Sequence, residues 1–425
     1  METDSSTSVT AGSAIQNGAS IHNFWKLWSA NGFSNLGDGL YQIVLPLLAA
    51  QLTDSPTRIA TLSVMLSLPW LLFALQAGSI VDKFDRHKVM FWVTCGRVAL
   101  LFLLTIAVIM NFISLPFLYI VAFLMGVGET LVDTAFTSIV PAVVSRDRLN
   151  WANAQITAMQ TVTNTFIGPP LAGLLAGMSF ALATGSSTLM YVAAILALLL
   201  IRGTFTAPAH TDSPTRPHIW AHVTGGLRFL WNNRLIRDLT LFTASMNIFW
   251  SGWGALLVLY AVKPGPMELS EFEYGLLLTV MAVGGLLGSM LANRLQKQLG
   301  TRNALALDFV GTILLVGIPA LTANFWAVGA AVFIAGMGAS VWVILVASIR
   351  QQVVPSDLLG RVYSASRFVS WGIGPLGAAT AGLIAEFWGI RTMFAIGALA
   401  SILTLLLFLN VIPSSKLQEF DDLKR

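Results

Sequence analysis

Charge, cysteine and histidine are scarce in this 425-residue chain. Only 10% of its residues are Asp, Glu, Lys or Arg, whereas a soluble globular protein carries about 25%. The single cysteine, Cys95, excludes an internal disulfide and a cysteine-based metal site. We found no nucleotide-binding Gly-rich loop with a Lys, and all five histidines lie outside the long apolar runs, at His22, His87, His210, His218 and His222. The sequence therefore predicts no metal, no cofactor, no ATP hydrolysis and no membrane-embedded enzyme.

Long apolar runs dominate what is present. Hydrophobic residues make up 56% of the chain, and runs of about 20 apolar residues are long enough for a helix to cross a bilayer. The runs do not alternate as the strands of a membrane barrel would. We expect twelve spans, at 27–51, 59–81, 89–111, 115–138, 152–176, 181–201, 239–262, 274–293, 303–322, 326–349, 364–385 and 392–412.

The placement of basic residues predicts the orientation of these spans. With the N-terminus inside, only Arg58, Lys263 and Arg391 fall on the outer side and Arg97 lies within a span, while the other Lys and Arg residues collect on the cytoplasmic side. Both termini are therefore expected in the cytoplasm of a multi-pass plasma-membrane protein. Binding of nucleic acid is not needed to explain the net charge of +4.

A long polar segment divides six spans from six. The expected domains are a disordered tail (1–23), a six-helix bundle (24–202), a linker with an interfacial helix (203–235), a second bundle (236–413) and a tail (414–425). Internal similarity supports two homologous halves, because "IVPAVVSRDRLNWANAQ" from Ile139 resembles "IRQQVVPSDLLGRVYSA" from Ile349.

The segment "AGSIVDKFDRHKVM" between spans 2 and 3 concentrates charge. Its residues Gly78, Asp82, Lys83, Asp85, Arg86 and Lys88 resemble the loop signature of the major facilitator superfamily, except that Asp85 stands where the general pattern has Gly. An acid there is similar to the branch of macrolide-efflux proteins and siderophore exporters. The resemblance implies an all-α membrane protein with twelve transmembrane helices in two pseudo-symmetric six-helix bundles. Asp82 would accept hydrogen bonds at a helix N-terminus of the other bundle, with Arg86 beside it, as a cytoplasmic gate; the alternative is an ordinary solvated loop.

Span 5 carries a second resemblance. "FIGPPLAG", with Gly168, Pro169 and Gly173, is similar to the Gly-Pro-x-x-Gly-Gly motif of superfamily antiporters, with Ala172 in place of one Gly. The motif favours export; the alternative is a packing kink without directional meaning.

Polar residues inside spans are costly and usually face a cavity. Those of span 1 lie at i, i+4, i+7 and i+11, which places them on one helix face. In the second half, spans 7 and 10 present aromatic and neutral side chains, which suits an aromatic or amphipathic solute better than a sugar. The cavity candidates are Asn31, Asn35, Gln42, Gln160, Asn164, Asn247, Trp250, Trp253 and Trp342; for each Trp, packing or interfacial anchoring is the alternative.

Four charged residues of the first half are candidates for proton coupling: Glu129, Asp38, Asp133 and Arg97. Asp38 lies about 16 Å, or eleven residues, from the cytoplasmic end of its span. A carboxyl group shielded from water and near a second carboxylate binds a proton more readily. Arg97 could instead hold Glu129 or Asp133 in a permanent ion pair, and we expect Asp308 and Arg367 to be structural.

The prediction is a monomeric secondary transporter that exchanges protons for lipophilic or amphipathic small molecules such as drugs or siderophores, exporting them by alternating access. A proton-coupled importer of a small solute is the first alternative. A non-transporting membrane receptor is the second.

Overall fold

Helices make up almost all of the computed structural model, which describes residues 21–145, 148–203, 205, 219–355, 358–412 and 417. Within these residues, ten segments are long and apolar enough to cross a membrane. Two of the twelve expected spans are not among those ten. Helix α2, the first span, carries a polar stripe, and the fifth span is divided into three helices that are each short. The chain divides into two compact units, one formed by residues 1–45 and 69–211 and the other by 46–68 and 212–425.

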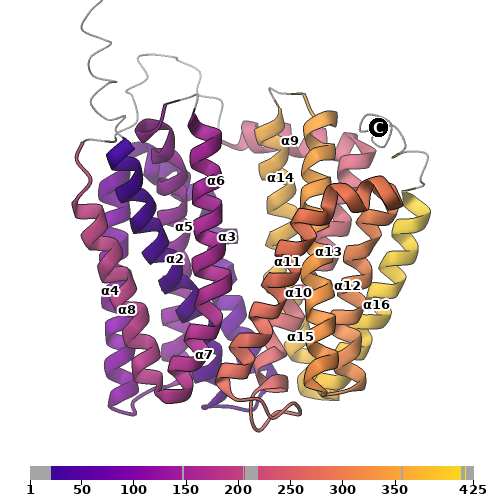
Figure 1. Ribbon diagram of the computed structural model, residues 1–425, viewed down its shortest axis with the longest axis horizontal. Coiled ribbons are helices and arrows are strands. Elements are labelled where there is room, and N and C mark those ends of the chain that lie inside the picture. Colours follow the sequence, from indigo (N-terminus) through magenta and orange to yellow (C-terminus); the bar gives the residue numbers. More distant parts are fainter. Residues whose placement is uncertain are drawn as a thin grey trace, which may run out of the picture. The chain divides into compact units, whose positions relative to one another are not determined.

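In the first unit, α4 packs against both α5 and α8 (Figure 1). One hydrophobic core of this unit joins side chains from the two ends of its sequence, with Phe24 and Leu27 in the same cluster as Leu198 and Ile201. The helices of this unit are α2 (Ile21–Ala50), the later part of α3 (Pro56–Lys83), α4 (Arg86–Ile109), α5 (Leu115–Val143), α6 (Leu149–Gln160), the π-helix η2 (Thr161–Ile167), α7 (Gly168–Met178) and α8 (Phe180–Leu199).

The second unit has α13 against α11 and α12, and α16 against α12. In a bilayer, close packing replaces the hydrophobic effect as the force between helices. Gly284 and Gly288 allow this closeness, since a Cβ at either position would lie within 2.3 Å of a carbonyl oxygen of α13. The helices are α9 (Ile219–Asn232), α10 (Arg234–Ala261), α11 (Glu271–Leu299), α12 (Thr301–Leu321), α13 (Phe325–Val353), α14 (Leu359–Gly372), α15 (Gly374–Trp388) and α16 (Ile390–Val411).

Side-chain caps fix the starts of several helices. Ser179 begins α8, Asn233 begins α10 and Asn324 begins α13, each accepting a backbone N–H of the first turn. Ser270 and Glu273 form a reciprocal capping box at α11. These residues satisfy N–H groups that have no partner within the helix, so short polar segments of the sequence set the helix boundaries.

Helix α3 contributes to both units, with the division just before Pro69. Its first turns belong to the second unit, where Ala60 and Val64 pack against Ala255 and Ala378. The carboxylate of Glu386 in α15 accepts the Ser55 hydroxyl at 2.7 Å and the Thr57 N–H at 3.1 Å. Glu386 thus caps the start of α3.

Two expected spans are interrupted by Gly-Pro sequences. Span 5 is divided into α6, η2 and α7, and span 11 is divided into α14 and α15. Proline lacks the N–H that a continuous helix would use. Helix α7 begins at Gly168-Pro169-Pro170 and α15 at Gly374-Pro375, so the missing donors fall where a new helix starts.

Parts of the expected domain map lie outside the described residues. These are most of the N-terminal tail, residues 206–218 of the linker, and most of the C-terminal tail. The linker does contain a helix, α9, and the second half of this helix packs against α14. Gly226 allows the close contact, because a Cβ there would clash with the carbonyl oxygen of Arg361.

Candidate functional site

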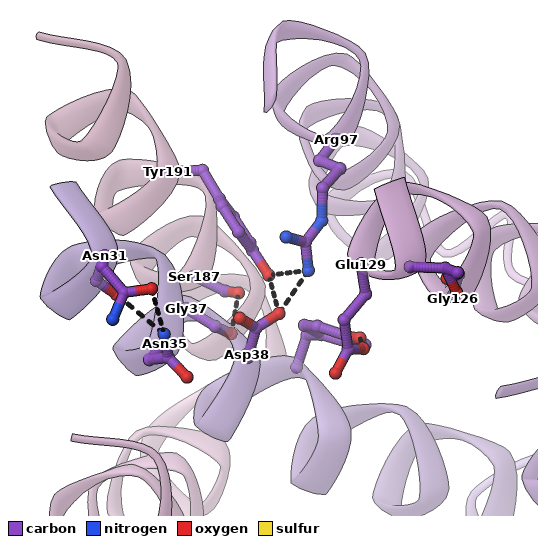
Figure 2. A network of polar contacts seen from close by, with 11 residues as sticks. Asn31, Asn35, Gly37, Asp38, Arg97, Gly126, Glu129, Ser187 and Tyr191 are labelled. Carbon is purple, nitrogen blue, oxygen red and sulfur yellow. Dashed lines mark hydrogen bonds and ion pairs between the residues drawn. The ribbon is translucent and has the colours of Figure 1, made fainter. Parts of the chain in front are cut away.

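A buried ion pair joins two helices of the first unit. Nη2 of Arg97 in α4 pairs with Oδ1 of Asp38 in α2 (Figure 2). The Arg97 side chain is 2% exposed and that of Asp38 is 8% exposed. This ion pair gives Arg97 a partner, Asp38, that differs from Glu129 and Asp133, the partners considered from the sequence.

Tyr191 in α8 completes the arrangement around the ion pair. Its hydroxyl accepts from Nη2 of Arg97 at 2.6 Å and donates to Oδ1 of Asp38 at 2.7 Å. The guanidinium carbon of Arg97 lies 4.3 Å from the centre of the Tyr191 ring, a cation–π distance. Three helices thus hold one carboxylate and one guanidinium in a fixed geometry.

Glu129 in α5 forms the other side of this cluster. Its Oε2 accepts the hydroxyl of Tyr41 at 2.8 Å, and the Tyr41 ring lies 5.8 Å from the Arg97 guanidinium carbon. Gly128, the preceding residue, makes room for Arg97, because a Cβ there would lie 2.9 Å from the Arg97 Cγ. We define Asp38, Tyr41, Arg97, Glu129 and Tyr191 as the carboxylate cluster.

The charges of the carboxylate cluster do not balance when both acids are ionised. Arg97 supplies one positive charge and is paired with Asp38, while the hydrogen bond found for Glu129 comes from a neutral hydroxyl. Transfer of an uncompensated charge out of water is costly. The arrangement can therefore take up one positive charge at Glu129, as a proton or as a cationic group.

Asp133 lies one turn beyond Glu129 on the same helix and is partly exposed. Its backbone carbonyl accepts the Thr137 hydroxyl at 3.0 Å. Its place on α5, one turn from Glu129, puts it near the carboxylate cluster.

The two tyrosines were not among the candidates from the sequence. Tyr41 follows Asp38 by three residues on α2, and Tyr191 comes from a helix more than 150 residues away. The sequence did hold a signal for Tyr41, since it lies three residues, about one helical turn, after the acid Asp38. For Tyr191 the sequence held no local signal, because its partners come from other helices.

The charged loop between α3 and α4 is tied to its own unit. Asp85 caps α4 by accepting the Lys88 N–H at 3.1 Å, and its other oxygen accepts the Phe205 N–H at 2.7 Å. His87 contacts the Leu198 carbonyl oxygen at 2.9 Å. These contacts explain an acid at position 85, since glycine would provide neither cap nor anchor. Lys83 is exposed, space is open around Gly78, and the side chain of Asp82 lies outside the described residues.

The antiporter-like motif lies where α2 meets α7. A Cβ at Gly39 would be 2.7 Å from the Asn164 carbonyl oxygen, and a Cβ at Gly168 would be 2.8 Å from the Gly39 Cα. Pro169 and Gly173 are buried beside them. The π-helix η2 ends at this contact, and such segments are often found at functional sites.

The neutral polar candidates of the first unit are partly buried. Asn35 donates to Asn31 Oδ1 at 3.1 Å, and Asn31 Nδ2 is buried with no hydrogen-bond partner in the described part of the chain. Gln42, Gln160 and Asn164 are of intermediate exposure.

In the second unit, three candidates are bound to other helices. Asn247 donates to the Ser370 carbonyl at 2.8 Å, Trp250 to the Thr312 hydroxyl at 3.1 Å, and Trp342 to the Thr243 hydroxyl at 3.0 Å. Trp253 is 3% exposed, and its indole N–H has no partner within the described residues. No group of three or more His, Cys, Asp or Glu residues suited to a metal occurs in the described part of the chain.

Comparison with known proteins agrees with this architecture. The family model "Transmembrane secretion effector" matches residues 18–424. The enterobactin exporter EntS of Salmonella typhi is 25% identical over 345 residues, covering 80% of each chain. The multidrug efflux pump Tap of Mycobacterium tuberculosis (strain ATCC 25618 / H37Rv) is 23% identical over 382 residues, covering 87% of this chain and 88% of that protein.

A solved structure shows the same fold at low identity. The crystal structure of the nucleoside transporter NupG is 15% identical, with a TM-score of 0.71, and covers 92% of this chain and 98% of that chain. The family match, the two helical units and the buried polar cluster lead to one conclusion. The chain belongs to the transmembrane secretion effector family of the major facilitator superfamily and is a multi-pass membrane transporter, not an enzyme.

Proposed function

We propose that this transporter is a proton-coupled exporter of lipophilic or amphipathic small molecules, such as drugs or siderophores. In this proposal it works as a monomer by alternating access in the cytoplasmic membrane, with both termini in the cytoplasm and with two six-helix bundles joined by the 203–235 linker. Relatives named as an enterobactin exporter and a multidrug efflux pump support the direction of transport.

The observation that carries the proposal is the charge balance of the carboxylate cluster. The ion pair between Asp38 and Arg97 is neutral as a whole, so the cluster carries a net charge of −1 when Glu129 is ionised and zero when Glu129 is protonated. A change of one charge in a poorly solvated site alters the stability of a conformation by several kcal/mol, at about 1.4 kcal/mol for each tenfold change in equilibrium. Glu129 is therefore placed to couple proton binding to conformation.

Exchange of protons for substrate would follow if the two compete for the negative charge of Glu129. A proton on Glu129 and a cationic or hydrogen-bonding substrate group would each compensate the carboxylate, and both at once would overcompensate it. The Tyr41 hydroxyl at 2.8 Å can donate to the ionised carboxylate or turn to accept from the protonated one. This hydroxyl supports both protonation states without movement of the helices.

The substrate class is argued from the second unit. Trp250 and Trp253 lie edge-on to each other, with ring centres 6.3 Å apart, and the indole N–H of Trp253 is buried without a hydrogen-bond partner among the described residues. Aromatic side chains bind apolar and cationic solutes through their faces. Such a surface fits an aromatic or amphipathic compound better than a sugar.

The experiment is transport into proteoliposomes with an imposed pH gradient, screened over macrolides, tetracyclines, siderophores and organic cations. We expect Glu129→Gln to abolish gradient-driven transport and to leave substrate binding, or exchange without a gradient, measurable. Glu271→Gln, at the first turn of α11, is the control and should behave as wild type.

Asp38→Asn should give the same transport loss, but it also leaves Arg97 without its partner, so Glu129→Gln is the cleaner variant. Wild-type pH dependence in both variants would show that neither carboxylate carries the proton. Accumulation of the compounds in cells that express the protein, in place of depletion, would favour the importer.

A further inference from the structure

A further acid within an expected span, Asp308, belongs to the second unit. Asp308 in α12 is 4% exposed, and its Oδ1 is buried without a hydrogen-bond partner among the described residues. The sequence suggested a structural role for it. A buried structural carboxylate would normally be bound by donors or by a cation, and the described contacts give this oxygen neither.

Residues next to Asp308 along α12 pack in a hydrophobic core. Its backbone packs against α13, where a Cβ at Gly338 would lie 2.8 Å from the Asp308 Cα. The next residue, Phe309, stacks edge-on against Trp342 with ring centres 5.5 Å apart and lies 4.8 Å from the ring of Phe408. Leu305, on the preceding turn, belongs to the same hydrophobic core.

Charged groups on the packed helices are engaged elsewhere or lie near helix ends. Arg302 of α12 donates to the Leu409 carbonyl, Arg350 of α13 to Ser366, and Asp238 of α10 is paired with Arg237 at 3.1 Å. The remaining ones of these helices are Arg234 and Tyr260 on α10, Glu271, Glu273, Tyr274, Arg294 and Lys297 on α11, and Arg391 on α16. Within the described residues, none of them forms an ion pair with Asp308.

An ionised carboxylate in such a place costs several kcal/mol, whereas the neutral acid costs much less. The buried Oδ1, with no donor among the described residues, therefore favours the neutral form of the Asp308 side chain. We propose that Asp308 is a second proton-binding site of the transporter, which gives up its proton to water when substrate displaces Trp250. The proposal deepens the proposed function and rests on it for the direction of coupling.

The link between Trp250 and Asp308 runs through Thr312. Thr312 follows Asp308 by four residues, so the two share one face of α12, and its hydroxyl accepts the Trp250 indole N–H at 3.1 Å. In the proposal, loss of that contact frees the hydroxyl and lets water reach this face of α12, which is buried in this conformation. The step is balanced: the O–H bond of the carboxyl group breaks, the proton passes to water as a hydronium ion, and the carboxylate remains, now solvated.

The test is infrared difference spectroscopy of the purified full-length protein in detergent, with the Glu129→Gln variant as background so that Glu129 contributes no acid band. We expect a C=O stretching band of a protonated carboxyl group near neutral pH. It should be absent in Asp308→Asn and retained in Asp238→Asn, a matched change at an acid that is ion-paired. An unchanged spectrum in Asp308→Asn would mean that Asp308 is ionised and would overturn the proposal.

Proton release is then measured in weakly buffered solution, with tetraphenylphosphonium as the lipophilic cation. The Glu129→Gln protein should release a proton as the cation binds and the carboxyl band should fall, and Asp308→Asn should lose both signals while still binding the cation. A band that does not respond to bound cation identifies a permanently protonated structural acid and also overturns the proposal. Failure of the proposed function gives a different result: the Glu129→Gln variant would then retain gradient-driven transport. That result is measured independently of the Asp308 band.

Discussion

The effects of substituting Asp38 and Arg97 on the free energy of unfolding should be strongly coupled, because the two side chains form a buried ion pair. Removing one partner of a buried pair costs about 3–5 kcal/mol, because the other charge is left uncompensated. Asp38→Asn leaves an Arg97 side chain that is 2% exposed, although it keeps the Tyr191 hydroxyl at 2.6 Å and the Tyr191 ring at 4.3 Å. A cation–π contact is worth about 0.5–2 kcal/mol, so we expect a cost near the lower limit, about 3 kcal/mol.

Arg97→Gln should cost a similar amount, since it leaves the Asp38 carboxylate with the Tyr191 hydroxyl as its remaining donor in the described contacts. The double variant removes both charges. It should cost only about 1–2 kcal/mol, from the altered hydrogen bonds to Tyr191, and so fall well below the sum of the single variants.

The measurement is equilibrium unfolding of purified protein in mixed micelles with rising SDS fraction, followed by tryptophan fluorescence, with Glu271→Gln as the control. Single variants that each cost less than about 1 kcal/mol, and that are additive in the double variant, would refute the buried pair. They would show that Arg97 and Asp38 are separately solvated.

Two contacts and the charged segment between α3 and α4 give three more testable expectations. Gly39→Ala places a Cβ 2.7 Å from the Asn164 carbonyl oxygen, so it should lower stability by about 1–3 kcal/mol in the same unfolding assay, with Gly254→Ala, in open space, as control. Asp85→Ala removes the cap of α4 and the contact with the Phe205 N–H, so in the same assay it should lower the free energy of unfolding by about 1–2 kcal/mol. An unchanged free energy would mean that water replaces the carboxylate. Asp82→Asn should impair transport at near-normal membrane abundance, and unchanged transport at normal expression would exclude the gate role.

The sequence by itself determined the fold class and most helix positions. Apolar runs of about 20 residues have few alternatives to a membrane span, and the segment from Gly78 to Lys88 identified the superfamily before any contact was known. The sequence also supplied the polar stripe of α2 and the acids Asp38 and Glu129, because charged residues are rare in membrane helices and so are conspicuous.

The tertiary structure alone decided which of these residues meet. Asp38, Arg97 and Tyr191 come from α2, α4 and α8, and the pairing of Arg97 with Asp38 depends on how those helices pack. The π-helix η2 and the Asp308 oxygen that lacks a partner among the described residues could not be predicted either, since each depends on hydrogen bonds made or missing in three dimensions. Residue type and spacing fix the faces of a helix, but the partner of a buried charge is set by side chains that other helices bring to it.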